Sequence, residues 1–131
     1  FFGYTHCPDV CPTTLAALAR GRRLLGTLGN NVTVAFVTVD PQRDSRAVVA
    51  AYVRMFDPAF VGLTGTERQL DPVYAEYHVF HQKLPAKSAL GYLVAHSSTI
   101  DFIGADGRVR ETGDWSDTPQ QLAADMKEAA S

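Results

Sequence analysis

Two cysteines, Cys7 and Cys11, are the residues of this chain best suited to chemistry. They are its only cysteines and stand in the segment Cys-Pro-Asp-Val-Cys-Pro, with three residues between them. Four interpretations compete: a structural disulfide, a redox dithiol, a metal site, or two unrelated buried thiols. A disulfide that closes so short a loop restrains the unfolded chain by only about 2 kcal/mol. Because 46% of the residues are hydrophobic, the fold has little need of that restraint, and the structural interpretations are the weaker ones.

The spacing leaves the metal and redox interpretations open. Residues four apart on one helical turn share a face, with Cβ atoms about 5–6 Å apart, so the sulfurs can converge on one ion or, with some adjustment, on each other. A helix N-terminus favours negative charge and lowers the pKa of a thiol, which helps both chemistries. Thioredoxin-type oxidoreductases usually have two residues between their cysteines. The wider spacing here suits a chelate more than an exchange pair.

Two thiolates leave a metal ion under-coordinated, so the four histidines are candidate ligands. His96 stands between two apolar runs at a predicted strand end, where α/β folds place ligands, although spacing alone favours a structural role. His6 adjoins the first cysteine on an extended segment, where neighbouring side chains diverge, so we expect it to be exposed or structural. His78 and His81, three residues apart, could bind a metal together, but surface positions are the better interpretation.

Length and composition predict one domain, residues 1–131, with a single hydrophobic core. With 12 basic and 14 acidic residues and a pI near 6.1, no global field favours a nucleic-acid partner. No stretch approaches the roughly 18–20 apolar residues that span a bilayer. A strand and the cysteine loop come at the very first residues. We therefore expect upstream sequence, with the first strands and any targeting peptide or membrane anchor, to be missing from this chain.

The order of elements predicts an α/β fold, β-α-β-α-β-α followed by a hairpin and a final helix. The first half of the chain should contain a strand at 1–4, a helix from near Pro12 to Gly29, a central, parallel strand at 32–39 and a second helix capped by Asp44 or Ser45. This second helix has one apolar stripe, formed by Val48, Val49, Tyr52 and Phe56. The second half should contain a strand at 60–63, a helix with a Thr66–Gln69 capping box, an insertion or flap at 79–92, a hairpin over 98–111, and a helix from Thr118 through about Ala129. This order is compatible with a thioredoxin-like fold, a central mixed sheet flanked by helices. Phe1, Phe2, Phe36 and Trp115 are expected in the core.

Asp40 is a secondary candidate, because it ends the central strand on the side where the cysteine loop should lie. With Pro41 it can simply terminate the strand. It is also a candidate to orient a ligand through an outer hydrogen bond, or to contact a partner protein.

Three segments resemble the signatures of the Sco/SenC family of copper-delivery proteins. They are Phe2–Pro12 around the cysteines, Val37–Asp44, and Tyr92–Ser97 around the histidine, and they occur in the family's order. The similarity continues through the Asp-Gly-Arg turn at 106–108 and so extends over essentially the whole chain. One departure is Ala95, since family members commonly have an acidic residue just before the ligand histidine.

The resemblance implies a thioredoxin-like fold, an N-terminal transmembrane tether, and copper ligands at Cys7, Cys11 and His96. It implies delivery of copper to the dinuclear copper site of cytochrome c oxidase. The alternative is an enzyme, a thiol-disulfide reductase that maintains the copper-site cysteines of a partner. The expected partners are the copper-site subunit of the oxidase or another copper acceptor or donor protein. The expected location is the periplasmic side of a bacterial inner membrane.

The chemistry of these three ligands agrees with copper. Soft thiolates with an imidazole select Cu(I) or zinc over hard cations. Three ligands fall short of the four that close a structural zinc site. They suit trigonal Cu(I), with Cu(II) as the second state considered, and leave an approach for an incoming ligand from a partner.

Overall fold

The computed structural model describes residues 1–7, 10–85, 92–96 and 98–131. Helices and strands alternate through most of this length, as the sequence predicts. The elements are β1 (Phe2–Gly3), α1 (Val10–Leu24), a 3₁₀ helix η1 (Gly26–Asn31), β2 (Ala35–Thr38), α2 (Arg46–Arg54), β3 (Val61–Leu63), α3 (Glu67–Glu76), β4 (His81–Pro85), β5 (Tyr92–His96), β6 (Ile100–Ile103), β7 (Val109–Gly113) and α4 (Pro119–Ala130).

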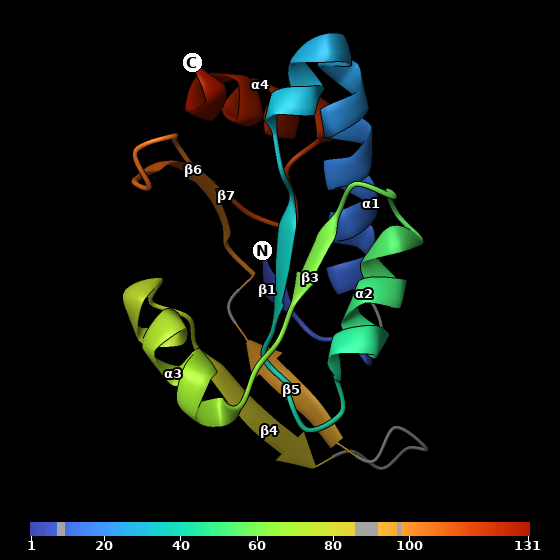
Figure 1. The fold of residues 1–131 in the computed structure, drawn as a ribbon, viewed down its shortest axis with the longest axis vertical. Coiled ribbons are helices and arrows are strands. Elements are labelled where there is room, and N and C mark those ends of the chain that lie inside the picture. The colour runs from blue at the N-terminus through green and yellow to red at the C-terminus, as the bar shows by residue number, and fades with distance from the viewer. Residues whose placement is uncertain (8–9, 86–91, 97) are drawn as a thin grey trace.

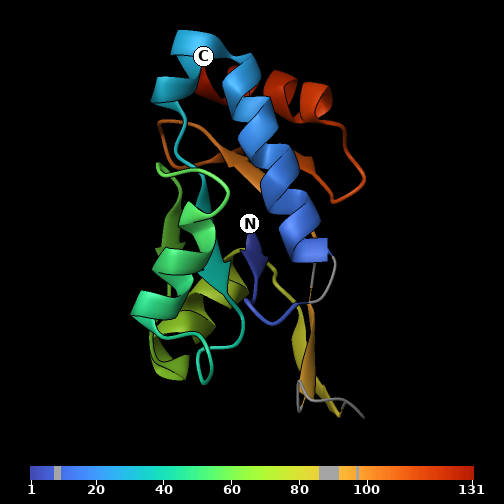
Figure 2. The ribbon, with the colours of Figure 1, turned by 90° about the vertical axis from the view of Figure 1, so that its right-hand side faces the viewer.

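The strands β1, β2 and β3 form a parallel sheet with β2 in the centre, the position that its apolar run predicts. Helices α1 and α2 lie on one side of this sheet and α3 lies on the other (Figures 1 and 2). Within the described residues, β4–β5 and β6–β7 are antiparallel pairs that form two further, separate sheets. The α/β layers and the mixed strand directions confirm the expected thioredoxin-like fold, with its strands hydrogen-bonded in three groups.

Two clusters of buried side chains make up the core. The larger lies between the sheet and helices α1, α2 and α4, and it includes Phe36, Leu15 and Leu122. The smaller lies under α3 and includes Phe2 and Tyr4. Phe1, Phe2 and Phe36 are buried as predicted.

The prediction for Trp115 is wrong, because its side chain is 52% exposed. This residue falls in the turn between β7 and α4, beyond the last paired residue of the hairpin. An aromatic residue is therefore left at the surface by its place in the connection.

Two predicted helices differ in detail. Helix α1 ends at Leu24, and Gly26, with φ of 59°, takes the left-handed position after it, so Gly26 rather than Gly29 stops the helix. At α2 the cap is Ser45, whose side chain accepts a hydrogen bond from the Val48 amide. The buried residues of this helix are Val49 and Val53, and Tyr52 and Phe56 pack against the core. The predicted stripe is therefore confirmed except at Val48, which is 41% exposed.

The local signals in the second half of the chain are confirmed. Thr66 and Thr118 each form a complete capping box, and Gly107 has the positive φ of a tight turn between β6 and β7. The segment 79–92, expected to be an insertion or flap, contains β4 at 81–85 and the first residue of β5, Tyr92. Residues 81–84 are all exposed, so no alternation of apolar and polar residues marks β4 in the sequence. Residues 86–91 lie outside the described part. No helix described in the structure has the length and apolarity to cross a membrane.

Candidate metal centre

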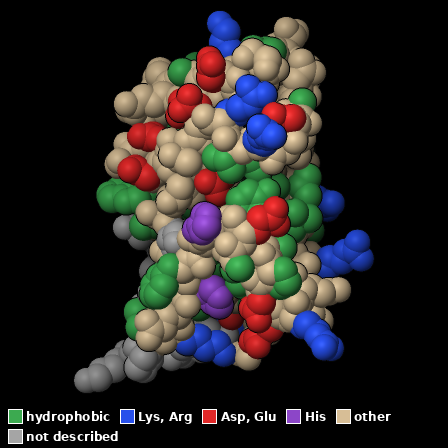
Figure 3. Space-filling view, turned by 90° about the vertical axis from the view of Figure 1, so that its left-hand side faces the viewer, with side chains coloured by type: hydrophobic (Ala, Val, Ile, Leu, Met, Phe, Trp, Pro, Cys, Tyr) green, Lys and Arg blue, Asp and Glu red, His purple; other side chains and the backbone are tan. Residues whose placement is uncertain are grey.

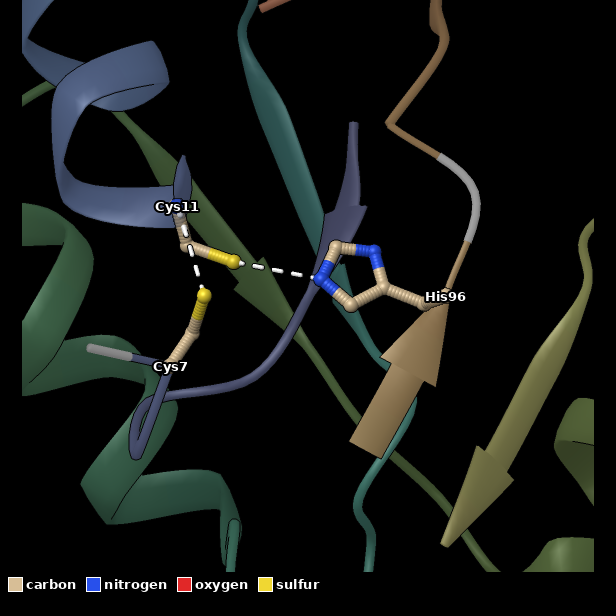
Figure 4. A group of neighbouring side chains, drawn as sticks. All are labelled: Cys7, Cys11 and His96. Atoms are coloured by element: carbon tan, nitrogen blue, oxygen red, sulfur yellow. Dashed lines mark hydrogen bonds between the residues drawn. The ribbon is translucent and has the colours of Figure 1, made fainter. Parts of the chain in front are cut away.

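Cys7, Cys11 and His96 meet at one point from three different elements (Figure 4). Cys7 follows β1, Cys11 lies in the first turn of α1, and His96 is the last residue of β5. One ligand atom from each lies within 4.8 Å of the others, and Cys11 Sγ is 3.5 Å from His96 Nε2. The two cysteines are not joined in a disulfide; Cys11 is fully buried, whereas Cys7 and His96 are partly exposed.

The start of helix α1 holds the two sulfurs close together. The Cys11 amide donates a hydrogen bond to Cys7 Sγ at 3.4 Å, and the Cys7 amide donates to the Tyr4 carbonyl at 3.2 Å. A helix N-terminus carries partial positive charge, so this amide stabilises electron-rich sulfur at Cys7. The loop therefore directs two soft sulfur donors toward the space next to His96.

The loop is fixed to the rest of the sheet by the buried carboxylate of Asp44. The amide and the hydroxyl of Thr5 both donate to this carboxylate, and the hydroxyl of Thr38 donates to it as well. Thr5 stands two residues before Cys7, so Asp44 holds the base of the loop. The sequence predicts Asp44 or Ser45 as a helix cap, and Ser45 is the residue that caps α2. The actual role of Asp44 depends on a partner 39 residues away.

Gly3 makes room for the buried sulfur. A Cβ atom placed on Gly3 would lie 2.6 Å from Cys11 Sγ and 2.8 Å from a ring carbon of Phe36. Such distances are far inside ordinary contact. The sequence contains the glycine in its first motif, but nothing in the spacing reveals that it borders the sulfur.

Two aromatic rings contact the imidazole of His96. The ring of Tyr4 stands edge-on to it at a centroid distance of 5.8 Å, and that of Phe1 at 6.5 Å. Edge-to-face packing restricts the orientation of a ring. The imidazole is therefore held in a largely apolar wall with its Nε2 toward the sulfurs (Figure 4).

The pKa of the Cys11 thiol is raised strongly. The hydrogen bond with Cys7 is the largest cause, burial is the next, and the charge of Cys7 adds to both. A thiol of this kind is a poor nucleophile for exchange, since the thiolate is the reactive form. It remains a good metal ligand, because a soft cation can displace the proton and supply the missing positive charge.

Asp40 belongs to a second group, in which ligand atoms of His6, Asp40 and Asp44 lie within 4.8 Å of one another. Its buried carboxylate forms an ion pair with Arg43, and its amide donates to the hydroxyl of Thr38. These contacts fit a strand-ending residue. The role of Asp40 in orienting a ligand stays a prediction.

The remaining histidines lie at the surface, as expected for His78 and His81. His78 follows α3 in a left-handed conformation, and His81 is exposed with its ring 4.5 Å from that of Tyr74. Among the described residues, neither joins a cluster of three metal-binding side chains. The side chain of Ala95, the departure noted in the third motif, lies outside what the structure describes.

The surface charge agrees with the balanced composition. Figure 3 shows acidic and basic side chains along the length of one face, without a continuous basic stripe. The net charge of the chain is −2.

Comparison with known proteins finds relatives that are similar over most of this chain. Protein SCO1 homolog, mitochondrial, of Mus musculus is 38% identical over 109 residues, which are 82% of this chain and 38% of the relative. The chain thus spans less than half the length of the curated mammalian relatives that it matches.

Solved structures agree over almost the whole chain. Bradyrhizobium japonicum ScoI with copper bound superposes with a TM-score of 0.88 at 38% identity, covering 99% of this chain and 82% of that one. Yeast Sco1 with copper bound gives a TM-score of 0.84 at 30% identity, covering 98% and 72%. The sequence model of the SCO1/SenC family matches residues 1–131, and this chain belongs to that family.

Proposed function

We propose that this chain binds one copper ion through Cys7, Cys11 and His96 and delivers it to the dinuclear copper site of cytochrome c oxidase. The observation that carries the proposal is the convergence of two thiols and one imidazole, with ligand atoms within 4.8 Å of one another. Family membership adds to it, because three solved relatives have copper bound.

The spacing of the donor atoms fits a single ion. Metal–sulfur and metal–nitrogen bonds of about 2.3 Å and 2.0–2.1 Å, as for zinc, separate the two donors by about 3.6–3.8 Å at tetrahedral or trigonal angles. The separation between Cys11 Sγ and His96 Nε2 is 3.5 Å. Binding therefore requires these two atoms to move apart by only a few tenths of an ångström.

The donor set favours copper over the alternatives. Two thiolates and an imidazole are soft or intermediate donors, which excludes magnesium and calcium as the preferred ions. In the described part of the chain, this cluster gathers no fourth Cys, His, Asp or Glu. A closed structural zinc site has four ligands, whereas a trigonal Cu(I) site is complete with three.

The different burial of the sulfurs supports transfer to a protein partner. Cys11 is fully buried, whereas Cys7 is partly exposed at the end of its loop. An incoming thiolate reaches the metal from the side of Cys7, so ligand exchange begins there and the ion is never released to solvent. The partner would be the copper-site subunit of the oxidase or another copper donor or acceptor. The periplasmic face of a bacterial inner membrane, reached through an upstream anchor, stays a prediction.

Copper stoichiometry tests the binding step. The reduced protein is loaded with Cu(I) without oxygen, then passed through a desalting column, and bound copper is measured for the wild type and for Cys7→Ser, Cys11→Ser and His96→Ala. We expect one copper in the wild type and a loss of affinity by orders of magnitude in each variant. His81→Ala is the matched control, because His81 pairs with His96 in the hairpin and is exposed. Full retention after loss of either sulfur would refute the three-ligand site.

The same variants separate the carrier from the thiol-disulfide reductase. A reductase needs both cysteines and tolerates loss of the histidine, whereas the carrier fails without it. Copper is therefore followed from the loaded protein to the reduced copper-site domain of the oxidase. Weak copper binding by both wild type and His96→Ala, with thiol-disulfide exchange that survives the histidine change, would make the reductase the correct function.

A further inference from the structure

The cysteine loop and His96 follow strands of two different sheets, and among the described residues no backbone pairing joins these sheets. The cysteine loop follows β1 of the parallel sheet, while His96 ends β5 of a separate two-stranded sheet. Within the described residues, no strand of one sheet pairs with a strand of the other. The distance between the sulfurs and the imidazole therefore depends on side chains that connect the two sheets.

Tyr4 connects both sheets, because it contacts Cys7 on one side and the strand that carries His96 on the other. Its hydroxyl accepts a hydrogen bond from the Val94 amide at 3.1 Å, and its carbonyl accepts one from the Cys7 amide at 3.2 Å. Its ring stands at 89° to the imidazole of His96. The side chain is buried, with 2% of its surface exposed.

The hydrogen bond to Val94 has a specific geometric consequence. Val94 precedes His96 by two residues on β5, so the two side chains lie on the same face of the strand. The hydroxyl of Tyr4 takes the place that the carbonyl of a neighbouring strand would have in a continuous sheet. This hydrogen bond thereby fixes the position of β5 relative to the cysteine loop.

The ring of Tyr4 has a separate effect. It packs against the imidazole on one side, and the guanidinium of Arg43 lies 5.9 Å from its centre. A ring held between these groups has little freedom to tilt. It restricts rotation of the imidazole, and so keeps Nε2 directed at Cys11 Sγ.

We propose that Tyr4 is the positioning residue of this centre, because its hydroxyl docks the His96 hairpin onto the cysteine-bearing sheet and its ring fixes the imidazole. This inference deepens the proposed copper function and rests on it. The hydroxyl of Tyr4 sets the distance between His96 and the sulfurs, whereas the ring of Tyr4 sets the orientation of the imidazole.

Tyr4→Phe removes the hydroxyl and keeps the ring, and Tyr74→Phe is its matched control. Tyr74 is also buried, at 4% exposure, and its hydroxyl donates to a backbone carbonyl, that of Thr38, at 2.5 Å. Both changes therefore delete one buried tyrosine–backbone hydrogen bond. Only Tyr4 contacts the hairpin next to His96 through that bond.

Two measurements are made on each variant. Cu(I) affinity is determined by competition with a chelator, and amide exchange of Val94 is followed by NMR in the metal-free protein. We expect Tyr4→Phe to weaken copper binding by about 10- to 100-fold, the usual effect of losing a group that orients a ligand, and to speed exchange at Val94. Tyr74→Phe should leave copper affinity within about twofold and exchange at Val94 unchanged.

Copper affinity of Tyr4→Phe within twofold of the wild type would overturn the positioning role, as would unchanged exchange at Val94. Equal losses of copper affinity in the two tyrosine variants would also overturn it, since they would reflect general destabilisation. If the wild type bound no copper, the proposed function would fail, while the exchange comparison would still decide whether Tyr4 docks the hairpin.

Discussion

Replacing Gly3 with alanine should damage the centre by moving a sulfur. The new Cβ would lie 2.6 Å from Cys11 Sγ, about 1 Å inside an ordinary contact of roughly 3.5–4.0 Å. Gly3 has no positive φ, so the effect comes from space alone and not from backbone strain. Overpacking of this kind costs about 1–3 kcal/mol of folding free energy.

The shift should weaken copper binding as well as stability. Metal–ligand distances tolerate only about 0.2 Å, so displacement of Cys11 Sγ by several tenths of an ångström removes much of its bond. We expect Gly3→Ala to lower Cu(I) affinity at least about tenfold. The assay combines urea unfolding of the metal-free protein with chelator competition on the folded protein.

Gly62→Ala is the control for this experiment. A Cβ on Gly62 in β3 would overlap a methyl carbon of Val49 and lie 2.8 Å from the Val49 carbonyl oxygen, and no proposed ligand is among its nearest neighbours. It should destabilise the fold by at least as much and leave the copper affinity of the folded protein unchanged. If Gly3→Ala bound copper as tightly as the wild type, the close approach of Gly3 to the sulfur would not constrain the site, and the reasoning would be refuted.

Three other predictions concern the loop anchor, the buried thiol and a distant helix cap. Asp44→Ala leaves three donors without their acceptor and should lower the free energy of unfolding in urea by about 3 kcal/mol. Asp71→Ala, at an exposed position, should lower it by less than about 0.5 kcal/mol. Equal losses of stability in the two variants would contradict an anchoring role for Asp44. The pKa of Cys11 is raised above the ordinary thiol value of 9.0, so each copper ion that binds displaces a proton from this thiol. Chelator competition should therefore give a copper affinity that rises about tenfold per pH unit for each proton displaced. A copper affinity independent of pH would contradict thiol ligation. Thr118→Ala removes the cap of α4 and should lower stability by about 1 kcal/mol without altering copper affinity, and a change in copper affinity would show coupling that the structure does not predict.

The features that the sequence predicts well are local ones. The capping boxes at Thr66 and Thr118 and the turn at Gly107 each depend on residues within four positions of one another. The central position of β2 follows from its apolar run, because only a strand covered on both faces tolerates such a run. The weaker predictions concern which side chains of an element meet the core, such as Val48 in the stripe of α2.

The arrangement around the candidate centre depends on partners far apart in the chain. The hydroxyl of Tyr4 meets an amide 90 residues away, and Thr5 meets Asp44 across 39 residues. Spacing could not identify these pairs, nor could it choose His96 over a structural histidine. That choice came from the resemblance of three motifs, and the fold then brought the side chains to one point.

X-ray absorption at the copper edge, on wild-type protein loaded with Cu(I) without oxygen, tests the central claim most directly. The account predicts two sulfur atoms at about 2.3 Å from the copper ion and one nitrogen atom at about 2.0 Å from it. The nitrogen signal should disappear in His96→Ala and persist in His81→Ala. A shell with fewer than two sulfurs, or a nitrogen signal that survives the loss of His96, would contradict the three-ligand copper centre.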